Sequence, residues 1–432
     1  MSYRFRARAL SVLIAATLLA ASGFAQVPVG SINGIVTDPK DAIVIGGHVT
    51  AVSAAQGVSR DTVTNGNGLY ALSDLPPGNY DLRIEQAGFA VSEFKGVVLE
   101  AGLSRTIDAR LAIAHAGATV EVSAASAATV DVTQSMIQGQ ITSQTIQNIP
   151  LNGRNFLELA YLVPGNRPAP TFDPTKTNTL EVSSAGGFGR GGNITVDGGD
   201  NNDEVVGGTL SNFPEDSIQE FQIATSRFTS EVGRSGNSII NIVTKSGTNT
   251  LHGSAFLFER NRNLQALPAT FDRDLPTPRF DREQLGGSVG GPVKNDKAWW
   301  FSSFEFRDQN AALQTGARDF TTDTILNASA PAPLRDALLS NRIDVQLSPH
   351  NSLMGRYSFN RSTDTAEATP SQTTPAFTAS ERQNSLNRFN SAILGLTTVL
   401  GPTRVNNLTL HYDNFYNDIP PFADDTPRPI RV

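Results

Sequence analysis

Cysteine is absent from the 432 residues of the chain, and other residues that carry chemistry are scarce. The absence excludes disulfide frameworks, thiolate zinc sites and cysteine nucleophiles. The five histidines stand alone and form no H-E-x-x-H pattern, so the ligand set of a zinc hydrolase is missing as well; they are His48, His115, His252, His350 and His411. Charged residues make up only 17%, and the net charge of −7 argues against a protein built mainly to bind nucleic acid.

A hydrophobic run long enough to span a membrane is also missing. The apolar run at residues 9–21 has about 13 residues, whereas a membrane-spanning helix needs roughly 20. It follows Arg4, Arg6 and Arg8, and small residues after it end at Ala25. This order is typical of a secretory signal peptide that is cleaved after Ala25. We therefore predict that residues 1–25 direct export, and the length of the run disfavours the alternative, a membrane anchor.

Residues 29–113 show the two-residue period of β-strands. In Tyr80–Glu85 apolar and polar residues alternate strictly, and turn residues such as Pro76-Pro77-Gly78 separate the strands. Short strands at this spacing predict a small antiparallel β-sandwich with one buried face per sheet. The segments Gly34–Asp38 and Leu75–Tyr80 resemble the carboxypeptidase regulatory-like module, which implies a scaffold without the zinc enzyme.

Residues 114–132 are rich in alanine, serine and threonine and predict an extended linker. The linker contains one β-prone segment, formed by Thr119, Val120, Glu121, Val122 and Ser123. Such a segment can add as a strand to the edge of a partner's sheet, because its backbone groups are otherwise unpaired. Two alternatives stay open at this point: the segment is only linker, or it is the first strand of the next domain.

Residues 133–248 combine helical and strand patterns and predict an α+β domain. The segment Ile141–Pro150 predicts a short helix that ends at proline, and residues 156–163 predict a second helix with Leu159 and Leu162 on its apolar face. Residues 239–243 are apolar on both sides, so this strand is expected to be buried on both faces.

Three motifs in or near this domain imitate functional sites. Gly187–Gly192 fits the dinucleotide-binding pattern G-x-G-x-x-G, but a strand rather than a helix is predicted after it. Gly286–Gly290 fits the nucleophile pattern G-x-S-x-G, again without a following helix. We predict that both are glycines in tight turns and bends. The acidic cluster Asp197–Glu204 lacks the spacing of a calcium-binding EF-hand loop, and we expect a solvated acidic loop.

Residues 249–432 contain several segments in which apolar and polar residues alternate, for example Arg342–Ser348. Alternating segments with short turns at one end and long polar loops at the other are typical of a transmembrane β-barrel. The aromatic residues Trp299, Trp300 and Phe301 suit a girdle at the lipid boundary. A soluble β-sandwich with the same alternation is the alternative, since periodicity alone does not separate the two.

The segments around the start of this region have a specific resemblance. Asp216–Gln222 and Arg227–Asn237 resemble the end of the plug domain of TonB-dependent outer-membrane receptors, and residues 242–254 resemble the junction between plug and barrel. Gln284–Val293, followed by the aromatic residues 299–301, is similar to early barrel strands of the Oar-like subgroup, which also carries the N-terminal sandwich.

The resemblance implies a mainly β protein with an N-terminal β-sandwich, an α+β plug domain and the first part of a transmembrane antiparallel β-barrel. It implies a location in the cell outer membrane, with the N-terminal domains in the periplasm. It also implies that Thr119–Ser123 is a TonB box, the segment that pairs with the TonB energy-transducing complex. The other implied partners are outer-membrane lipid and an unidentified extracellular ligand; no catalytic, cofactor or metal site is expected.

The implied function is energy-coupled uptake or binding of that ligand, and the alternative is a non-transporting periplasmic or surface adhesion module. Two features depart from the family. A barrel of 22 strands needs ~220 residues in strands alone, whereas residues 250–432 number 183. The tail Asp424–Val432 contains Pro427 and Pro429 and is a poor closing strand. We therefore expect the chain to be the N-terminal part of a longer receptor.

Overall fold

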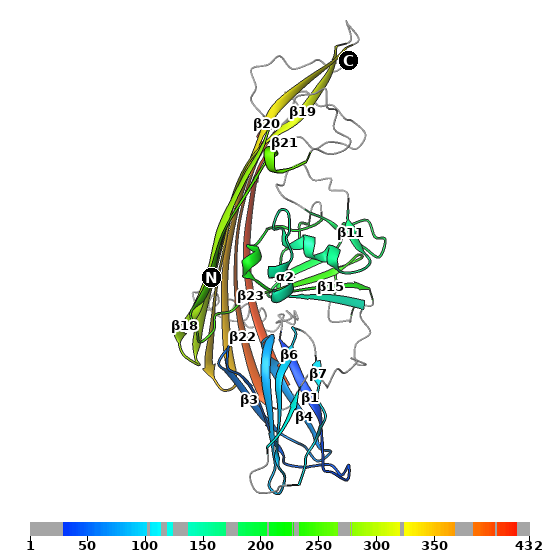
Figure 1. Ribbon diagram of the computed structural model, residues 1–432, viewed down its shortest axis with the longest axis vertical. Coiled ribbons are helices and arrows are strands. Elements are labelled where there is room, and N and C mark those ends of the chain that lie inside the picture. The colour runs from blue at the N-terminus through cyan, green and yellow to red at the C-terminus, as the bar shows by residue number, and fades with distance from the viewer. Residues whose placement is uncertain are drawn as a thin grey trace, which may run out of the picture.

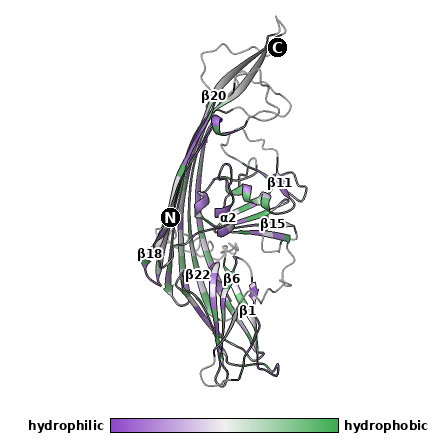
Figure 2. Ribbon diagram, viewed as in Figure 1, coloured by the Kyte–Doolittle hydropathy of each residue, from purple (hydrophilic) through white to green (hydrophobic). Residues whose placement is uncertain are grey.

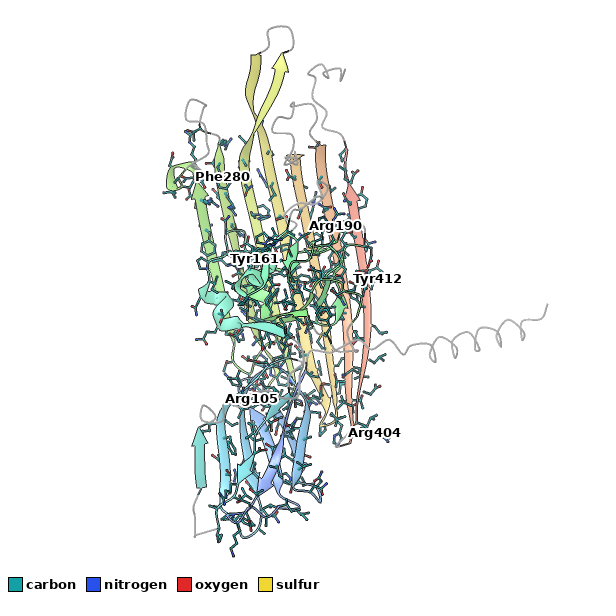
Figure 3. The ribbon with its side chains drawn as sticks, turned by 90° about the vertical axis from the view of Figure 1, so that its right-hand side faces the viewer. Arg105, Tyr161, Arg190, Phe280, Arg404 and Tyr412 are labelled. Carbon is teal, nitrogen blue, oxygen red and sulfur yellow. The ribbon has the colours of Figure 1, made fainter. Side chains whose placement is uncertain are left out.

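The computed structural model has three folded parts in chain order (Figure 1). The N-terminal sandwich lies at one end, and the middle domain lies on the concave side of a tall, curved C-terminal sheet in Figure 1 and in front of the face of that sheet in Figure 3. No helix in the parts of the chain that the structure describes is long and apolar enough to cross a membrane. The predicted signal peptide and the tail Asp424–Val432 lie outside the described residues, which are 29–101, 104–113, 119–123, 137–169, 180–204, 207–226, 228, 233–266, 277, 279–319, 324–367, 383–401 and 404–420.

The N-terminal sandwich consists of two sheets around one apolar core. One sheet has the strand order β4-β1-β7, with β8 also paired to β1, and the other has the order β3-β2-β5-β6-β9. The predicted period of two is confirmed, because Tyr80, Leu82 and Ile84 in β5 are at most 1% exposed while the residues between them face solvent. The strands are β1 (Gly30–Thr37), β2 (His48–Ser53), β3 (Val58–Val63), β4 (Leu69–Leu75), β5 (Gly78–Glu85), β6 (Val91–Leu99), β7 (Ser104–Thr106), β8 (Ala109–Arg110) and β9 (Thr119–Ser123).

The middle domain is built on one mixed sheet with the order β10-β15-β16-β13-β14. Strand β16 is buried on both faces, as its apolar residues predict. The predicted second helix is a 3-10 helix in which Phe156, Leu157, Leu159 and Ala160 are buried, whereas Leu162, expected on its apolar face, is the last residue of the helix and is 45% exposed. The elements are β10 (Ile137–Thr142), α2 (Ser143–Asn148), η2 (Phe156–Leu162), β11 (Asn166–Pro168), β12 (Val182–Ser184), β13 (Asn193–Val196), β14 (Gly199–Asp200), η3 (Glu215–Ser217), β15 (Ile218–Ser226) and β16 (Ile239–Thr244).

The C-terminal sheet has seven antiparallel strands in sequence order, and β17 and β23 are its open edges among the described strands. The alternating segment Arg342–Ser348 lies in β20, which forms a tight antiparallel hairpin with β21. The strands have 10 to 25 residues, and the longest pair, β19 and β20, extends past the others at the end far from the sandwich (Figure 1). The elements are β17 (His252–Asn261), η4 (Arg262–Leu264), β18 (Phe280–Lys294), β19 (Ala298–Asp319), β20 (Thr324–Ser348), β21 (Asn351–Glu367), β22 (Gln383–Gly401) and β23 (Arg404–Asp418).

Alternation gives this sheet two different faces, visible as alternating colours along the strands in Figure 2. On the face away from the middle domain, Phe304, Leu394 and Leu410 are at least 45% exposed. On the face toward the middle domain, Glu305 and Arg356 are each only 4% exposed. An apolar outer face and a polar inner face are what a barrel wall in a bilayer requires.

Two predictions about this sheet are wrong in detail. Trp299 and Phe301 are 4% and 3% exposed and face inward, so only Trp300 suits a lipid girdle, because neighbouring residues in a strand point to opposite faces. The glycines at 286–290 lie inside strand β18 rather than in a turn. A Cβ atom on Gly286 would lie 2.6 Å from the ring of Phe256, so glycine is needed for close packing of the strands.

Candidate functional site: the charged interface of the middle domain and the C-terminal sheet

The turn after β13 places an acidic residue between the middle domain and the C-terminal sheet. Asp197 has a φ of +50°, in the left-handed region that Asp tolerates better than most residues, and Gly198 follows it. Its Oδ1 and Oδ2 atoms accept hydrogen bonds from the backbone N (2.9 Å) and Oγ1 (2.7 Å) of Thr244. These bonds tie the turn to the end of β16 and fix the direction of the carboxylate.

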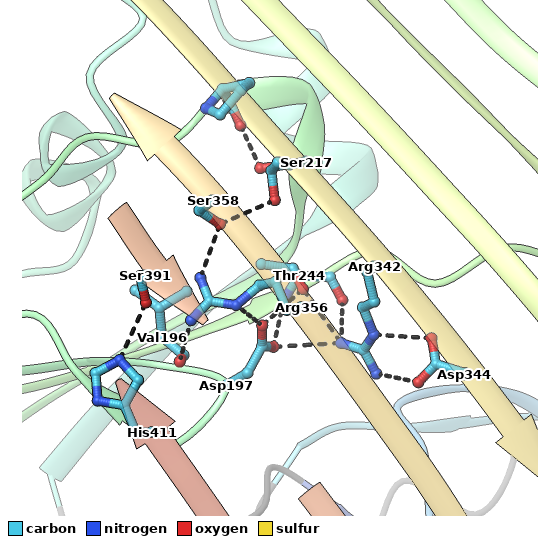
Figure 4. Close-up of polar contacts among 12 residues, drawn as sticks. Val196, Asp197, Ser217, Thr244, Arg342, Asp344, Arg356, Ser358, Ser391 and His411 are labelled. Atoms are coloured by element: carbon cyan, nitrogen blue, oxygen red, sulfur yellow. Dashed lines mark hydrogen bonds and ion pairs between the residues drawn. The ribbon is translucent and has the colours of Figure 1, made fainter. Parts of the chain in front are cut away.

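Two arginines of the C-terminal sheet reach this carboxylate (Figure 4). The Nε atom of Arg356 lies 3.0 Å from Oδ2 of Asp197, and the Nη1 atom of Arg342 lies 3.3 Å from Oδ1. Both arginines also donate to backbone carbonyls of the middle domain. Arg342 donates to the carbonyl of Thr244 at 2.8 Å, and Arg356 donates to that of Val196 at 3.1 Å. The two strands that carry them, β20 and β21, thus hold the same turn.

The cluster is almost entirely removed from solvent and balanced in charge. The side chains of Asp197, Arg356 and Arg342 are 0%, 1% and 13% exposed. Arg342 holds a second carboxylate, Asp344, with hydrogen bonds of 2.9 Å and 2.8 Å, and Ser246 donates to that carboxylate at 2.6 Å. Two guanidinium groups therefore face two carboxylates. Buried charges persist when they are paired in this way, and removal of one partner leaves an uncompensated charge.

A second charged cluster joins the middle domain to the sheet near β19. Arg154, which precedes η2 and has a φ of +52°, lies 3.0 Å from Glu305 through Nε and 2.9 Å from Asp216 through Nη2. Its Nη1 atom lies 3.5 Å from Glu215, and its guanidinium group lies 4.0 Å from the centre of the Phe256 ring. Burial raises the pKa of Glu215 to about 7, although the charge of Arg154 acts to lower it.

The sandwich contacts the middle domain at Ala101, whose carbonyl accepts a hydrogen bond from the side-chain amide of Gln222. Oε2 of Glu220 in β15 accepts a hydrogen bond of 3.1 Å from the backbone N of Ala101, and the side-chain amides of Gln140 and Gln222 donate to the same carboxylate. Glu220 is 4% exposed. Burial raises its pKa to about 7, while the hydrogen bond from Ala101 acts to lower it.

The sandwich contacts the C-terminal sheet at a separate place. The backbone N of Asn249 donates to the carbonyl of Ala55, between β2 and β3, at 3.1 Å. The indole Nε1 of Trp299 donates to Oδ1 of Asn249 at 2.8 Å, which explains why this tryptophan faces inward. Arg60 adds a long hydrogen bond of 3.5 Å to Gln346. The sandwich is therefore attached independently to both other parts of the molecule.

The structure places Thr119–Ser123 on the sandwich. As strand β9, the segment pairs in parallel with β6, with Thr119 opposite Val91 and Ser123 opposite Lys95. It is the outermost strand in the order of that sheet, and it is not part of the middle-domain sheet. The alternative that this segment begins the next domain is therefore wrong.

The acidic cluster Asp197–Glu204 is not the solvated loop that we predicted. Asp197, Asn201 and Asp203 are 1%, 2% and 8% exposed, and Asp200 pairs with Arg234 at 2.6 Å. Asp197 is buried against the C-terminal sheet, whereas Asn201 is hydrogen-bonded to Thr209 and Ser211 of its own domain. Over the ranges that the structure describes, no group of three or more metal-ligating side chains occurs.

Comparison with known proteins gives two family matches in chain order. Residues 31–112 match the model of the carboxypeptidase regulatory-like domain, and residues 243–329 match that of the outer membrane beta barrel domain. A relative, the TonB-dependent transporter Oar of Myxococcus xanthus, is 29% identical over 316 residues, which cover 69% of this chain and 28% of the relative. The chain thus spans less than a third of the length of that relative.

Solved outer-membrane structures are similar at low sequence identity. The outer membrane transporter YddB from Escherichia coli is 12% identical with a TM-score of 0.49, over 64% of this chain and 38% of that chain. The siderophore receptor PirA from Acinetobacter baumannii is 16% identical with a TM-score of 0.45, over 65% of this chain and 40% of that chain.

The fold and the family matches define an outer-membrane β-barrel protein with an N-terminal sandwich module. More closely, the resemblance to Oar-like TonB-dependent outer-membrane receptors is confirmed, because the matches occur in the predicted order and the relative is itself such a transporter. The relative from Myxococcus xanthus is named as a transporter.

Proposed function

We propose that the chain is the N-terminal part of a receptor that binds or takes up an extracellular ligand with energy supplied by the TonB complex. In this proposal residues 1–25 are the signal peptide, residues 29–113 form a periplasmic sandwich, and residues 114–132 form a linker that carries the TonB box. Residues 133–248 act as the plug, and residues 249–432 form the first part of the barrel wall. The role is transport without catalysis, in keeping with relatives that are transporters and receptors.

The observation that carries the proposal is the buried contact of Asp197 with Arg342 and Arg356. It holds the middle domain against the inner face of a sheet whose outer face is apolar. Charged groups regain hydration when they separate, and this hydration offsets part of the lost pairing, so such a contact can open more readily than a purely apolar one. Among the described strands, β17 and β23 are edges without a further partner, which is untenable in lipid, so the proposed barrel needs further strands to close.

The barrel part of the proposal is tested by the mass and the location of the native protein. We expect a heat-modifiable protein in purified outer membranes with an intact mass well above the 46.1 kDa of this chain. Recovery in the soluble periplasm, with the mass of residues 26–432, would contradict a pore and support the non-transporting binding module.

The TonB box is tested by the double substitution Val120→Pro and Val122→Pro in the native receptor. Proline has no backbone N–H, so the segment can no longer pair with a partner strand. We expect outer membranes with this variant to retain at least ten-fold less of the purified periplasmic domain of the TonB protein. The matched control is Val130→Pro in the same linker, which should retain the domain. Equal retention by both variants would place the coupling segment elsewhere.

A further inference from the structure

Strand β9 completes a sheet that would otherwise end at β6. Five residue pairs, from Val91 opposite Thr119 to Lys95 opposite Ser123, join the two strands in parallel. Without β9, the backbone N–H and C=O groups along one side of β6 would be unpaired, as on any sheet edge. The segment proposed as the TonB box therefore already has a partner within its own chain.

The attachment of the sandwich decides where a pull on docked β9 would go. The sandwich is tied to the middle domain at Glu220 and to the C-terminal sheet at Asn249. A force applied to β9 in its docked position passes through β6 into the sandwich, and from there into both contacts. Because the C-terminal sheet is fixed in the membrane, part of that force would not act on the middle domain at all.

A pull on released β9 would take a different route. Residues 124–136 connect β9 directly to β10, which is the edge strand of the middle-domain sheet. These thirteen residues span at most about 45 Å when fully extended. A pull on released β9 therefore reaches β10 only when β9 has moved far enough to extend the segment between them. Once β9 has left β6, the whole force acts on β10 and on the sheet behind it.

We propose that the β6 edge is a resting dock for Thr119–Ser123 and that it competes with the TonB strand for these five residues. The segment completes the sandwich sheet in the resting receptor, and it must leave β6 before coupling begins. A short parallel ladder at the end of a sheet is suited to this exchange, because parallel pairing is slightly weaker per residue than antiparallel pairing. The competition rests on the proposed function, whereas the dock itself does not.

No cysteine in these 432 residues competes with an engineered pair in the sandwich, so a disulfide introduced into the native receptor tests the dock directly. Glu93 and Glu121 are register partners across β6 and β9. Paired strands lie about 4.8 Å apart, within the range of Cα separations that a disulfide allows. The variant with Glu93→Cys and Glu121→Cys should therefore form a disulfide in the oxidising periplasm, seen as a change in migration that a reductant reverses.

The matched control carries Arg83→Cys and Glu93→Cys. These residues are register partners between β5 and β6, so the control disulfide staples the same sandwich and leaves β9 free. We measure retention of the purified periplasmic domain of the TonB protein by outer membranes, with and without reductant. The β6–β9 disulfide should lower retention at least ten-fold, and reduction should restore it. The control should retain the domain equally in both states.

The remaining outcomes each overturn a defined part of the proposal. A β6–β9 pair that stays reduced while the control pair oxidises would show that the dock does not exist. Equal retention by the oxidised and reduced forms would overturn the competition, and the variant with Val120→Pro and Val122→Pro would then decide whether TonB uses the open edge of docked β9 or a segment elsewhere. Absence of retention in the reduced form would overturn the proposed coupling segment, and with it the competition, while the disulfide would still report the dock.

Discussion

The core of the sandwich and the interface between the middle domain and the C-terminal sheet are both dry, but they are built from different groups. The sandwich core consists of apolar side chains, of which Leu82 and Ile84 are fully buried. The interface is centred on the charged side chains of Asp197, Arg342 and Arg356. Hydration of apolar surface costs about 25 cal/mol per Å², whereas parted charges recover hydration that offsets the lost pairing. The sandwich is thus built as a permanent unit, and the interface as a specific contact that can separate.

The largest effect is expected from Asp197→Ala, which leaves Arg342 and Arg356 buried with one carboxylate between them. Removal of one partner from a buried ion pair costs about 3–5 kcal/mol. We expect the middle domain to loosen, so that cells with this variant of the native receptor become more susceptible to vancomycin, which is too large for an intact outer membrane. The control Asp200→Ala removes a half-exposed acid nearby and should change susceptibility little. Equal susceptibility of both variants would mean that the charged cluster does not hold the plug.

A comparable loss is expected from Leu82→Ala, but only in the sandwich. Truncation of a fully buried leucine costs about 2–5 kcal/mol. The urea concentration at which the sandwich loses protease protection should fall, while vancomycin susceptibility stays unchanged. Val63→Ala, at a position 56% exposed, should change the free energy of unfolding by less than about 0.5 kcal/mol, so the midpoint should hardly move. If Leu82→Ala raised vancomycin susceptibility as Asp197→Ala does, the sandwich and the interface would not be independent units.

The sequence predicts these two regions unequally. A two-residue period identifies the core side of β5, because only one register buries the apolar residues. The same alternation places Arg342, Asp344 and Arg356 on one face of the C-terminal hairpin, opposite the lipid side. Their partner Asp197, however, lies 145 residues before Arg342, and no local pattern connects positions so far apart. The available signal was an Asp-Gly pair directly after a buried strand, which we interpreted as a solvated loop.

Local propensity likewise identifies a strand without its partner. The residues Thr119–Ser123 are β-prone, and they do form a strand. Which sheet they join depends on where the edge of β6 lies in the folded chain, and propensity carries no such information. The inward position of Trp299 was predictable by contrast, since strict alternation forbids three consecutive residues from facing lipid together.

A smaller, pH-dependent effect is expected at Glu220, between the two regions. Its pKa is raised from 4.5 to about 7 in the folded chain, so the docked carboxyl binds its proton more tightly than the free one. The contact with Ala101 is therefore strongest below pH 4.5 and weakens as the pH rises through 7. Spin labels on Val63→Cys and Thr145→Cys should give a narrow distance distribution at pH 5 and a broad one at pH 8. With Glu220→Gln, which does not ionise, the distribution should be narrow at both values, and a wild-type distribution that is the same at both would contradict this role.

The smallest effect is expected at an exposed ion pair whose nitrogen–oxygen distance equals that of the buried pair Arg342–Asp197. Arg110 lies 3.3 Å from Asp41, the distance that also separates Arg342 from Asp197. The side chains of Arg110 and Asp41, however, are 58% and 75% exposed. Asp41→Asn keeps a side chain that tolerates the φ of +61° at this position and removes only the charge. Exposed pairs contribute about 0–1 kcal/mol, so the urea midpoint of the sandwich should hardly move. Because the two pairs share one nitrogen–oxygen distance, a large shift of the urea midpoint for Asp41→Asn would show that this distance, rather than burial, sets the strength of the ion pairs. The difference between the exposed and the buried pair would then be contradicted.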